Sequence, residues 1–107
     1  MRLALNTFVY EVARVPVDEA LQSAHKFGFT FVEYAAYHSG DPTLMDRRRQ
    51  REVIHMFQDR GLRCSQLLLA NTEHMASPDP ARRQATLDYM KRCGEFQLEL
   101  GGRQVLV

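Results

Sequence analysis

Several features are scarce in this sequence of 107 residues, and each scarcity excludes a class of protein. Fourteen Lys and Arg residues stand against thirteen Asp and Glu, so the net charge of +1 supplies no general attraction to nucleic acid or to a membrane surface. Two cysteines, Cys64 and Cys93, form neither a CxxC motif nor a disulfide framework, and we expect reduced thiols in the core. No apolar run is long enough to span a membrane, and the opening MRLALNTF does not resemble a secretory signal. We therefore expect a cytoplasmic protein without nucleic-acid or membrane partners.

What the sequence does contain is a regular alternation of strand and helix patterns, in a composition that is 45% hydrophobic and 25% charged, typical of a globular domain. Apolar, β-branched and aromatic runs predict strands within residues 2–8, 29–37, 62–70 and 100–107. Apolar residues at helical spacing predict helices within residues 16–28, 44–61 and 80–100. The chain therefore predicts three strand–helix units followed by a fourth strand.

Helix boundaries and faces follow from local signals. Gly28 and Gly61 stand where a residue in the left-handed conformation ends a helix, and Asp79 with Pro80 forms a helix start. The last helix is expected to turn one apolar stripe inward, made of Leu87, Met90, Gly94 and Leu98. The basic run from Arg47 to Arg51 lies beside Asp46 and Glu52, which indicates a solvated helix face rather than a phosphate-binding patch.

Strand–helix units in series predict an α/β fold with a parallel sheet and right-handed crossovers. Two architectures fit this order. In the first, residues 1–107 are the N-terminal portion of one TIM-barrel domain, the first half of a (β/α)8 barrel, and the chain stops as the fourth strand begins. In the second, the chain is a free-standing flavodoxin-like domain, but such a domain normally has about five strands and a helix after the fourth. We favour the barrel.

Three segments, in order, resemble the xylose isomerase-like barrel superfamily. They are GFTFVEY at 28–34, RGLRCSQL at 60–67, and the stretch from ASPDP at 76–80 to RQVLV at 103–107. That group includes sugar phosphate isomerases and epimerases, dehydratases of cyclic polyols, and endonucleases that cut at abasic sites. The resemblance covers nearly the whole chain, and the order and spacing of the segments support it more than any single segment does.

The resemblance implies chemistry at the C-terminal ends of the barrel strands, where the βα loops gather. It also implies a divalent metal ion (Mn, Mg, Co or Zn) in the full-length protein, held by Glu, Asp and His residues from the second half of the barrel. Because those positions lie beyond this sequence, the resemblance implies that this chain alone binds no metal and does not catalyse the reaction.

Polar residues near the strand ends are the candidate substrate-binding groups. Glu33 interrupts the apolar segment FVEYAAY, where an unpaired charge would be costly, so it is expected either to contact substrate or to anchor the barrel mouth through hydrogen bonds. Asn6 and Asn71 follow the first and third strands, where an amide either binds a hydroxyl or serves a turn. His38 and His74 lie in the loops after the second and third strands.

The histidines do not form a metal-binding pattern. His38 and His74 have no further His or Cys at ligand spacing, so substrate contact or a surface role is expected for them. His25 and His55 fall within predicted helices and are expected to be structural. The endonuclease branch of the superfamily has a metal-binding His at the end of the third strand. Here that strand reads SQLLLAN, which argues against DNA repair.

Two functions from different classes remain. The first is a sugar isomerase or epimerase that acts on a sugar or polyol by metal-assisted proton transfer, with a possible homo-oligomeric state. The second is a non-catalytic flavodoxin-like binding module. A response regulator, the best-known such module, needs acidic residues at the ends of strands one and three, where this chain has Asn6 and Asn71.

Overall fold

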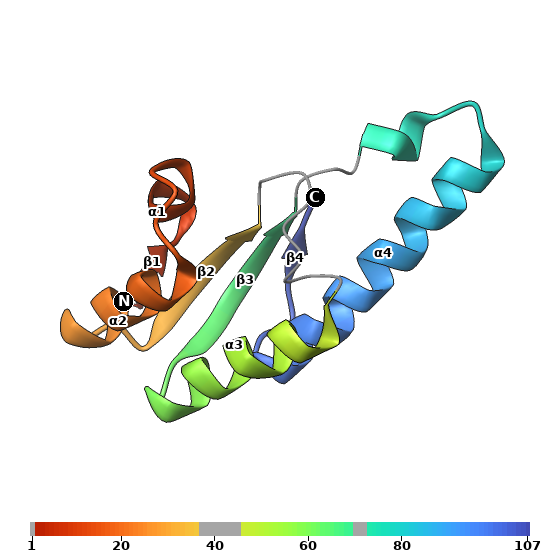
Figure 1. Ribbon diagram of the computed structural model, residues 1–107. Coiled ribbons are helices and arrows are strands. Elements are labelled where there is room, and N and C mark those ends of the chain that lie inside the picture. The colour runs from red at the N-terminus through yellow and green to blue at the C-terminus, as the bar shows by residue number, and fades with distance from the viewer. Residues whose placement is uncertain (1, 37–45, 70–72) are drawn as a thin grey trace.

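The computed structural model describes residues 2–36, 46–69 and 73–107, in which strands alternate with helices (Figure 1). The elements are β1 (Ala4–Asn6), α1 (Phe8–Val12), α2 (Val17–Lys26), β2 (Phe31–Ala36), α3 (Arg47–Asp59), β3 (Arg63–Leu69), the 3-10 helix η2 (Glu73–Ala76), α4 (Pro80–Glu99) and β4 (Val105–Leu106). The predicted α/β class is confirmed.

The four strands form one parallel sheet in the order β1-β2-β3-β4. Each strand therefore lies beside the strand that precedes it in the chain, as in the successive units of a barrel. A flavodoxin-like sheet has the order 2-1-3-4-5, which would place β1 between β2 and β3. Here β2 occupies that position, so the sheet does not have the flavodoxin-like order.

The predicted helix boundaries are confirmed. Gly28 has a φ of 80° and Gly61 a φ of 63°, so both adopt the left-handed conformation after α2 and α3. Asp79 accepts a hydrogen bond from the Ala81 backbone N–H and is followed by Pro80 in the first turn of α4. Sequence reasoning missed α1, because a helix of five residues is too short to show a periodic apolar pattern.

The core lies between one face of the sheet and the three longer helices. A single cluster of buried side chains joins Leu21 of α2, Phe57 of α3 and Phe96 of α4 to the strands. The Tyr34 ring of β2 meets the Phe57 and Phe96 rings edge to face, at centroid distances of 6.5 and 6.4 Å. Figure 1 shows α2, α3 and α4 on this one side of the sheet. The opposite face of the sheet is not covered by these helices, and it is called the open face below.

The predicted inward stripe of α4 was wrong for Leu87 and Leu98, whereas Met90 packs against the core as predicted. Leu98 is 64% exposed and Leu87 is 38% exposed. The residues of α4 that are buried are Thr86, Cys93, Phe96 and Gln97. The helix is therefore rotated by about one residue relative to the predicted stripe. An apolar-only stripe passed over Thr86 and Gln97. Thr86 Oγ1 donates to the Arg82 carbonyl of the same helix, and Gln97 Nε2 donates to the Cys64 carbonyl of β3, while Gln97 Oε1 is buried without a hydrogen-bond partner among the described residues.

Both cysteines are buried free thiols, as the sequence predicted. Burial raises the pKa of the Cys64 thiol to about 11, and burial raises the pKa of the Cys93 thiol to about 11 as well. Neither thiol is therefore ionised near neutral pH, and both act as small apolar groups in the core.

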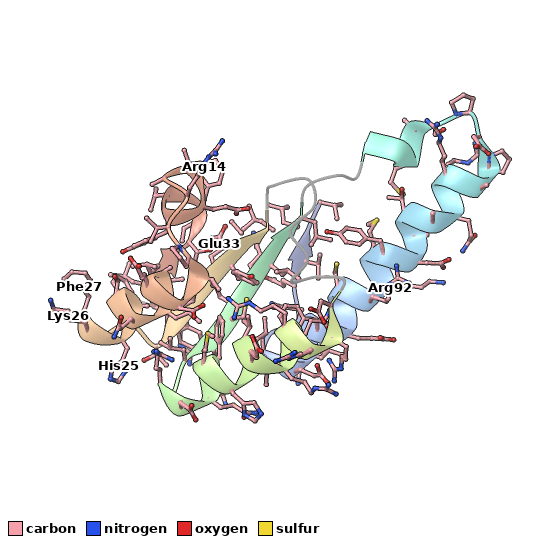
Figure 2. All side chains as sticks on the ribbon, viewed as in Figure 1. Arg14, His25, Lys26, Phe27, Glu33 and Arg92 are labelled. Atoms are coloured by element: carbon pink, nitrogen blue, oxygen red, sulfur yellow. The ribbon has the colours of Figure 1, made fainter. Side chains whose placement is uncertain are left out.

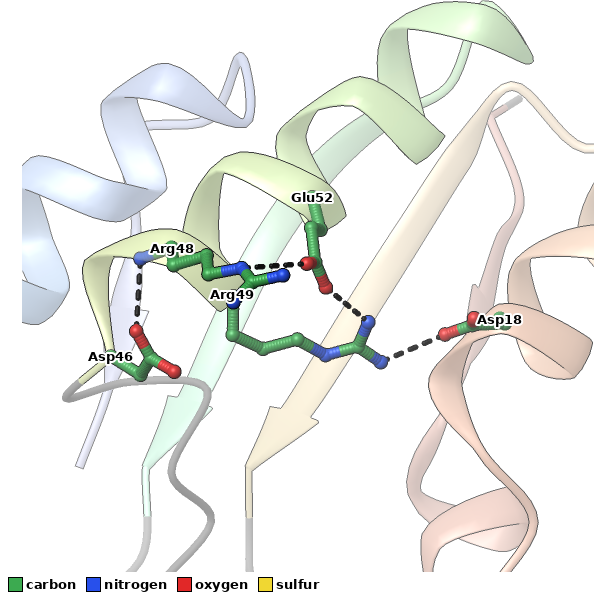
Figure 3. Close-up of polar contacts among 5 residues, drawn as sticks. All are labelled: Asp18, Asp46, Arg48, Arg49 and Glu52. Atoms are coloured by element: carbon green, nitrogen blue, oxygen red, sulfur yellow. Dashed lines mark hydrogen bonds and ion pairs between the residues drawn. The ribbon is translucent and has the colours of Figure 1, made fainter.

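The basic run of α3 is neutralised by carboxylates of its own helix and its neighbours (Figure 3). Arg49 bridges Glu52 at 3.0 Å and Asp18 of α2 at 2.9 Å. Arg47 makes two hydrogen bonds to the Glu99 carboxylate of α4, at 2.6 and 2.7 Å. These pairs confirm a solvated face that ties the helices together, and they leave no cluster of unpaired guanidinium groups for phosphate.

No helix among the described residues is both long and apolar enough to cross a membrane.

Candidate functional site

Asn6 and Glu33 meet on the open face of the sheet. Asn6 is the last residue of β1 and is the register partner of Glu33 in β2, so both side chains project from the same face. The Asn6 side-chain amide Nδ2 donates to Glu33 Oε1 at 3.2 Å. Figure 2 shows Glu33 on β2 beside the turn that leads into α1. Of the five predicted site residues, these two are brought together by the structure.

The β1–α1 turn holds this pair in place. Asn6 Oδ1 accepts a hydrogen bond from the Phe8 backbone N–H at 2.7 Å, at the start of α1. The Thr7 backbone N–H donates to the Glu33 carbonyl at 2.9 Å, and Thr7 Oγ1 accepts from the Ala35 N–H at 2.9 Å. Asn6 therefore uses its oxygen for the turn and its nitrogen for Glu33, which combines the two roles that the sequence left open.

The position of Glu33 differs from the prediction in one respect. The sequence placed it at the end of its strand, but β2 runs from Phe31 to Ala36 and Glu33 is its third residue. It lies level with the end of the shorter strand β1, and its side chain is half-buried. The carboxylate therefore lies three residues before the end of β2, and its charge is neither fully buried nor without a donor.

Gln66 is a site residue that sequence reasoning missed. It is the register partner of Glu33 on the other side, so Asn6, Glu33 and Gln66 form a row across three strands. A register shift between Val32 and Glu33 produces this alignment. The one available signal is the segment Ser65–Gln66, two successive polar residues in an apolar strand, which is a pattern that a β-bulge accommodates.

The other predicted candidates are not part of this row. His38 and Asn71 lie outside the described residues. The backbone of His74 belongs to η2, between β3 and α4. His25 lies near the end of α2, where its Nδ1 is 3.3 Å from the Arg60 carbonyl oxygen, and Figure 2 shows it away from Glu33. His25 thus has the structural contact expected of it.

A metal centre needs several ligand side chains around one point. Within residues 2–36, 46–69 and 73–107, no three His, Cys, Asp or Glu side chains are grouped closely enough to hold an ion. The polar row has one carboxylate and two amides, a poor ligand set for Zn²⁺ and an incomplete one for Mg²⁺. These residues do not fit a metal centre by themselves.

The row fits neutral hydroxyl groups better. A carboxylate accepts hydrogen bonds only, whereas the Asn and Gln amides both donate and accept. Adjacent strands are about 4.8 Å apart, so side chains in one row can contact neighbouring groups of a single small molecule.

No family model matches the sequence, and no curated protein matches it. The class is therefore defined by the fold itself, an α/β protein whose four parallel strands alternate with helices in sequential order.

Proposed function

We propose that this chain is the N-terminal part of a (β/α)8 barrel enzyme, an isomerase or epimerase that acts on a sugar or polyol. The supporting observation is the Asn6–Glu33 pair on the open face of a sheet whose strands follow one another in sequential order. In a barrel, helices cover the outside and the uncovered face of the strands points inward, so this pair would lie inside the barrel, below the mouth. The proposed substrate would enter from the C-terminal ends of the strands.

Glu33 is the proposed substrate-binding group. Oε1 is held by Asn6, and nothing among the described residues donates to Oε2. That oxygen is available to accept a hydrogen bond from a substrate hydroxyl, and a charged acceptor makes such a bond stronger than a neutral one. The hydrogen bonds of the β1–α1 turn keep the carboxylate in position before substrate arrives, which reduces the entropy lost on binding.

The proposed reaction moves a proton at the carbon next to the substrate carbonyl, through general acid–base catalysis. A divalent metal ion (Mn, Mg, Co or Zn) is part of this proposal, but its ligands would have to come from outside the described residues, and no step is assigned to it. The bases that move the proton are likewise not among the described residues. Glu33 orients the substrate, and the partner is a small sugar or polyol rather than nucleic acid or membrane.

Solvent exchange tests the reaction class. The protein expressed from its complete reading frame is incubated in D₂O with a panel of ketoses, aldoses and cyclic polyol ketones, with each of the four metal ions and with EDTA. Proton transfer next to a carbonyl exchanges that proton for deuterium, which NMR detects at a defined carbon. Exchange on at least one sugar is the expected result. A folded protein that exchanges no member of the panel under any of these conditions would contradict the proposal.

Glu33→Gln tests the residue. If the carboxylate binds a substrate hydroxyl, the variant keeps its fold and loses roughly tenfold to a thousandfold in turnover, about 1.4 to 4 kcal/mol of transition-state stabilisation. Glu95→Gln is the matched control, because Glu95 is exposed on α4 in the helical layer. A lowered melting temperature with unchanged turnover would show that Glu33 only anchors the sheet, and would refute its substrate role.

A further inference from the structure

Gln66 projects from the open face only because β3 contains a bulge. Val32 pairs with Cys64, but Glu33 pairs with Gln66, so Ser65 is the extra residue of β3. Without the extra residue, Ser65 would stand opposite Glu33, and Gln66 would turn toward the helices. β-bulges are common beside active sites, where they redirect a side chain.

The burial of β3 agrees with this geometry. Cys64 and Leu67 are buried on the helical side, whereas Ser65 and Gln66 between them are both half-buried. A regular strand would alternate, and would bury one of the two. The Ser65 hydroxyl is used locally, since Oγ donates to the Val32 carbonyl at 3.4 Å. The Gln66 side-chain amide makes no hydrogen bond with any residue that the structure describes.

We infer that Gln66 is a specificity-determining residue, whose amide binds a second hydroxyl of the ligand that Glu33 binds; the inference rests on the proposed function. Glu33 and Gln66 lie on adjacent strands and face the same side, about 4.8 Å apart at the backbone. The carboxylate accepts from one hydroxyl, and the amide donates to and accepts from the next. Two neighbouring hydroxyls on one small molecule meet this requirement, so the ligand class is a neutral polyhydroxylated compound.

The row also disfavours an anionic group at this point. Glu33 is its one charged member, and it would repel a phosphate or carboxylate placed between Glu33 and Gln66. Arg2, which precedes β1, has its guanidinium over the Phe31 ring at 5.4 Å, two residues before Glu33 along β2. A charged substituent of the ligand, if present, therefore lies away from the Glu33–Gln66 pair.

Calorimetric titration of the protein from its complete reading frame tests this role. The probes are D-fructose and myo-inositol, each beside its monodeoxy analogues. Gln66→Leu replaces the amide by an apolar group of similar size, and Gln66→Asn keeps the amide but shortens its reach. Gln58→Leu on the exposed face of α3 is the matched control. Thermal melts establish that each variant is folded, and Gln66→Asn decides the matter if Gln66→Leu does not fold.

The expected result is that both Gln66 variants bind the probe about threefold to tenfold more weakly than the wild type, as for the loss of one neutral hydrogen bond. They should also lose the discrimination against one monodeoxy analogue, while Gln58→Leu changes nothing. If the wild type binds a probe and Glu33→Gln weakens binding, but the Gln66 variants bind and discriminate as the wild type does, the inference is refuted and the proposed site stands. If the folded wild type binds neither probe, both are refuted.

Discussion

Replacing Gly102 by alanine should destabilise the protein severely, because this residue lies against the backbone of β3. A Cβ at Gly102 would fall inside the contact distance of the Cys64 carbonyl oxygen and of Gln97 Nε2. Gly102 also donates its backbone N–H to the Gln97 carbonyl at 3.1 Å, and Gln97 Nε2 donates to the Cys64 carbonyl at 3.4 Å. The segment before β4 must therefore move away from β3 to admit a methyl group.

That movement has a cost that can be bounded. It breaks the Gly102 and Gln97 hydrogen bonds and exposes part of the packing around Gln97, which is 1% exposed. Each buried polar group left without a partner costs about 1–3 kcal/mol, so Gly102→Ala should lower the free energy of unfolding by about 2–4 kcal/mol. Urea denaturation followed by circular dichroism, with linear extrapolation, measures the difference.

Gly94→Ala is the matched control for the same chemical change. Gly94 lies within α4, and a Cβ there would meet nothing within 4 Å. Alanine favours a helix over glycine by about 0.5–1 kcal/mol, so this variant should be more stable than the wild type. If the free energy of unfolding of Gly102→Ala lies within about 0.5 kcal/mol of the wild-type value, the close approach of the segment before β4 to β3 is refuted.

Three further predictions concern thiols, backbone strain and an ion pair. The pKa of the Cys64 thiol is raised from 9.0 to about 11, and so is that of Cys93, so these thiols ionise at a lower pH in the unfolded chain than in the folded protein. The free energy of unfolding should therefore fall as the pH rises from 9 to 11, by about 2–3 kcal/mol for Cys64 alone. Urea titrations at each pH should show a smaller loss of stability in Cys64→Ala than in the wild type, and an equal loss would refute the assignment. Arg14 has a φ of 57°, a left-handed conformation that glycine adopts more easily than a residue with a Cβ. The free energy of unfolding of Arg14→Gly should therefore exceed that of Arg14→Ala by about 0.5–1 kcal/mol, and equal values would show that the backbone is not strained there. The hydrogen bonds from Arg47 lower the pKa of Glu99, so the pair stabilises the fold above the ordinary pKa of a carboxyl group and loses this effect as the pH falls through the lowered pKa. Glu99→Gln should flatten the dependence of the melting temperature on pH in this acidic range, and an unchanged dependence would count against the pair.

The features of the fold that depend on residues close together in the chain were predictable from the sequence. Gly28, Gly61 and Asp79 mark helix ends because a left-handed residue or a capping oxygen acts within a few positions of the chain. The alternation of apolar strands with amphipathic helices indicated a parallel α/β sheet for a similar reason, since short connections constrain which elements can be neighbours. The burial of both cysteines followed from their place in such segments.

The tertiary structure decided what depends on contacts between distant segments. The rotation of α4 is one such feature: Gln97 is buried with its Nε2 donating to the Cys64 carbonyl of β3, whereas Leu98 is exposed. The candidate site is another. Asn6 and Glu33 are 27 positions apart in sequence, and only the register of β1 with β2 makes them hydrogen-bond partners.

Gln66 shows the difference most directly. Its neighbours in sequence place it in β3, but the face from which it projects depends on the extra residue at Ser65. A shift of one residue in register moves a side chain to the opposite face of a sheet, and the energy that selects the register comes from pairing with another strand. Local sequence therefore determined the strands and the three longer helices of this protein, and the packing of those elements determined which polar side chains share a face.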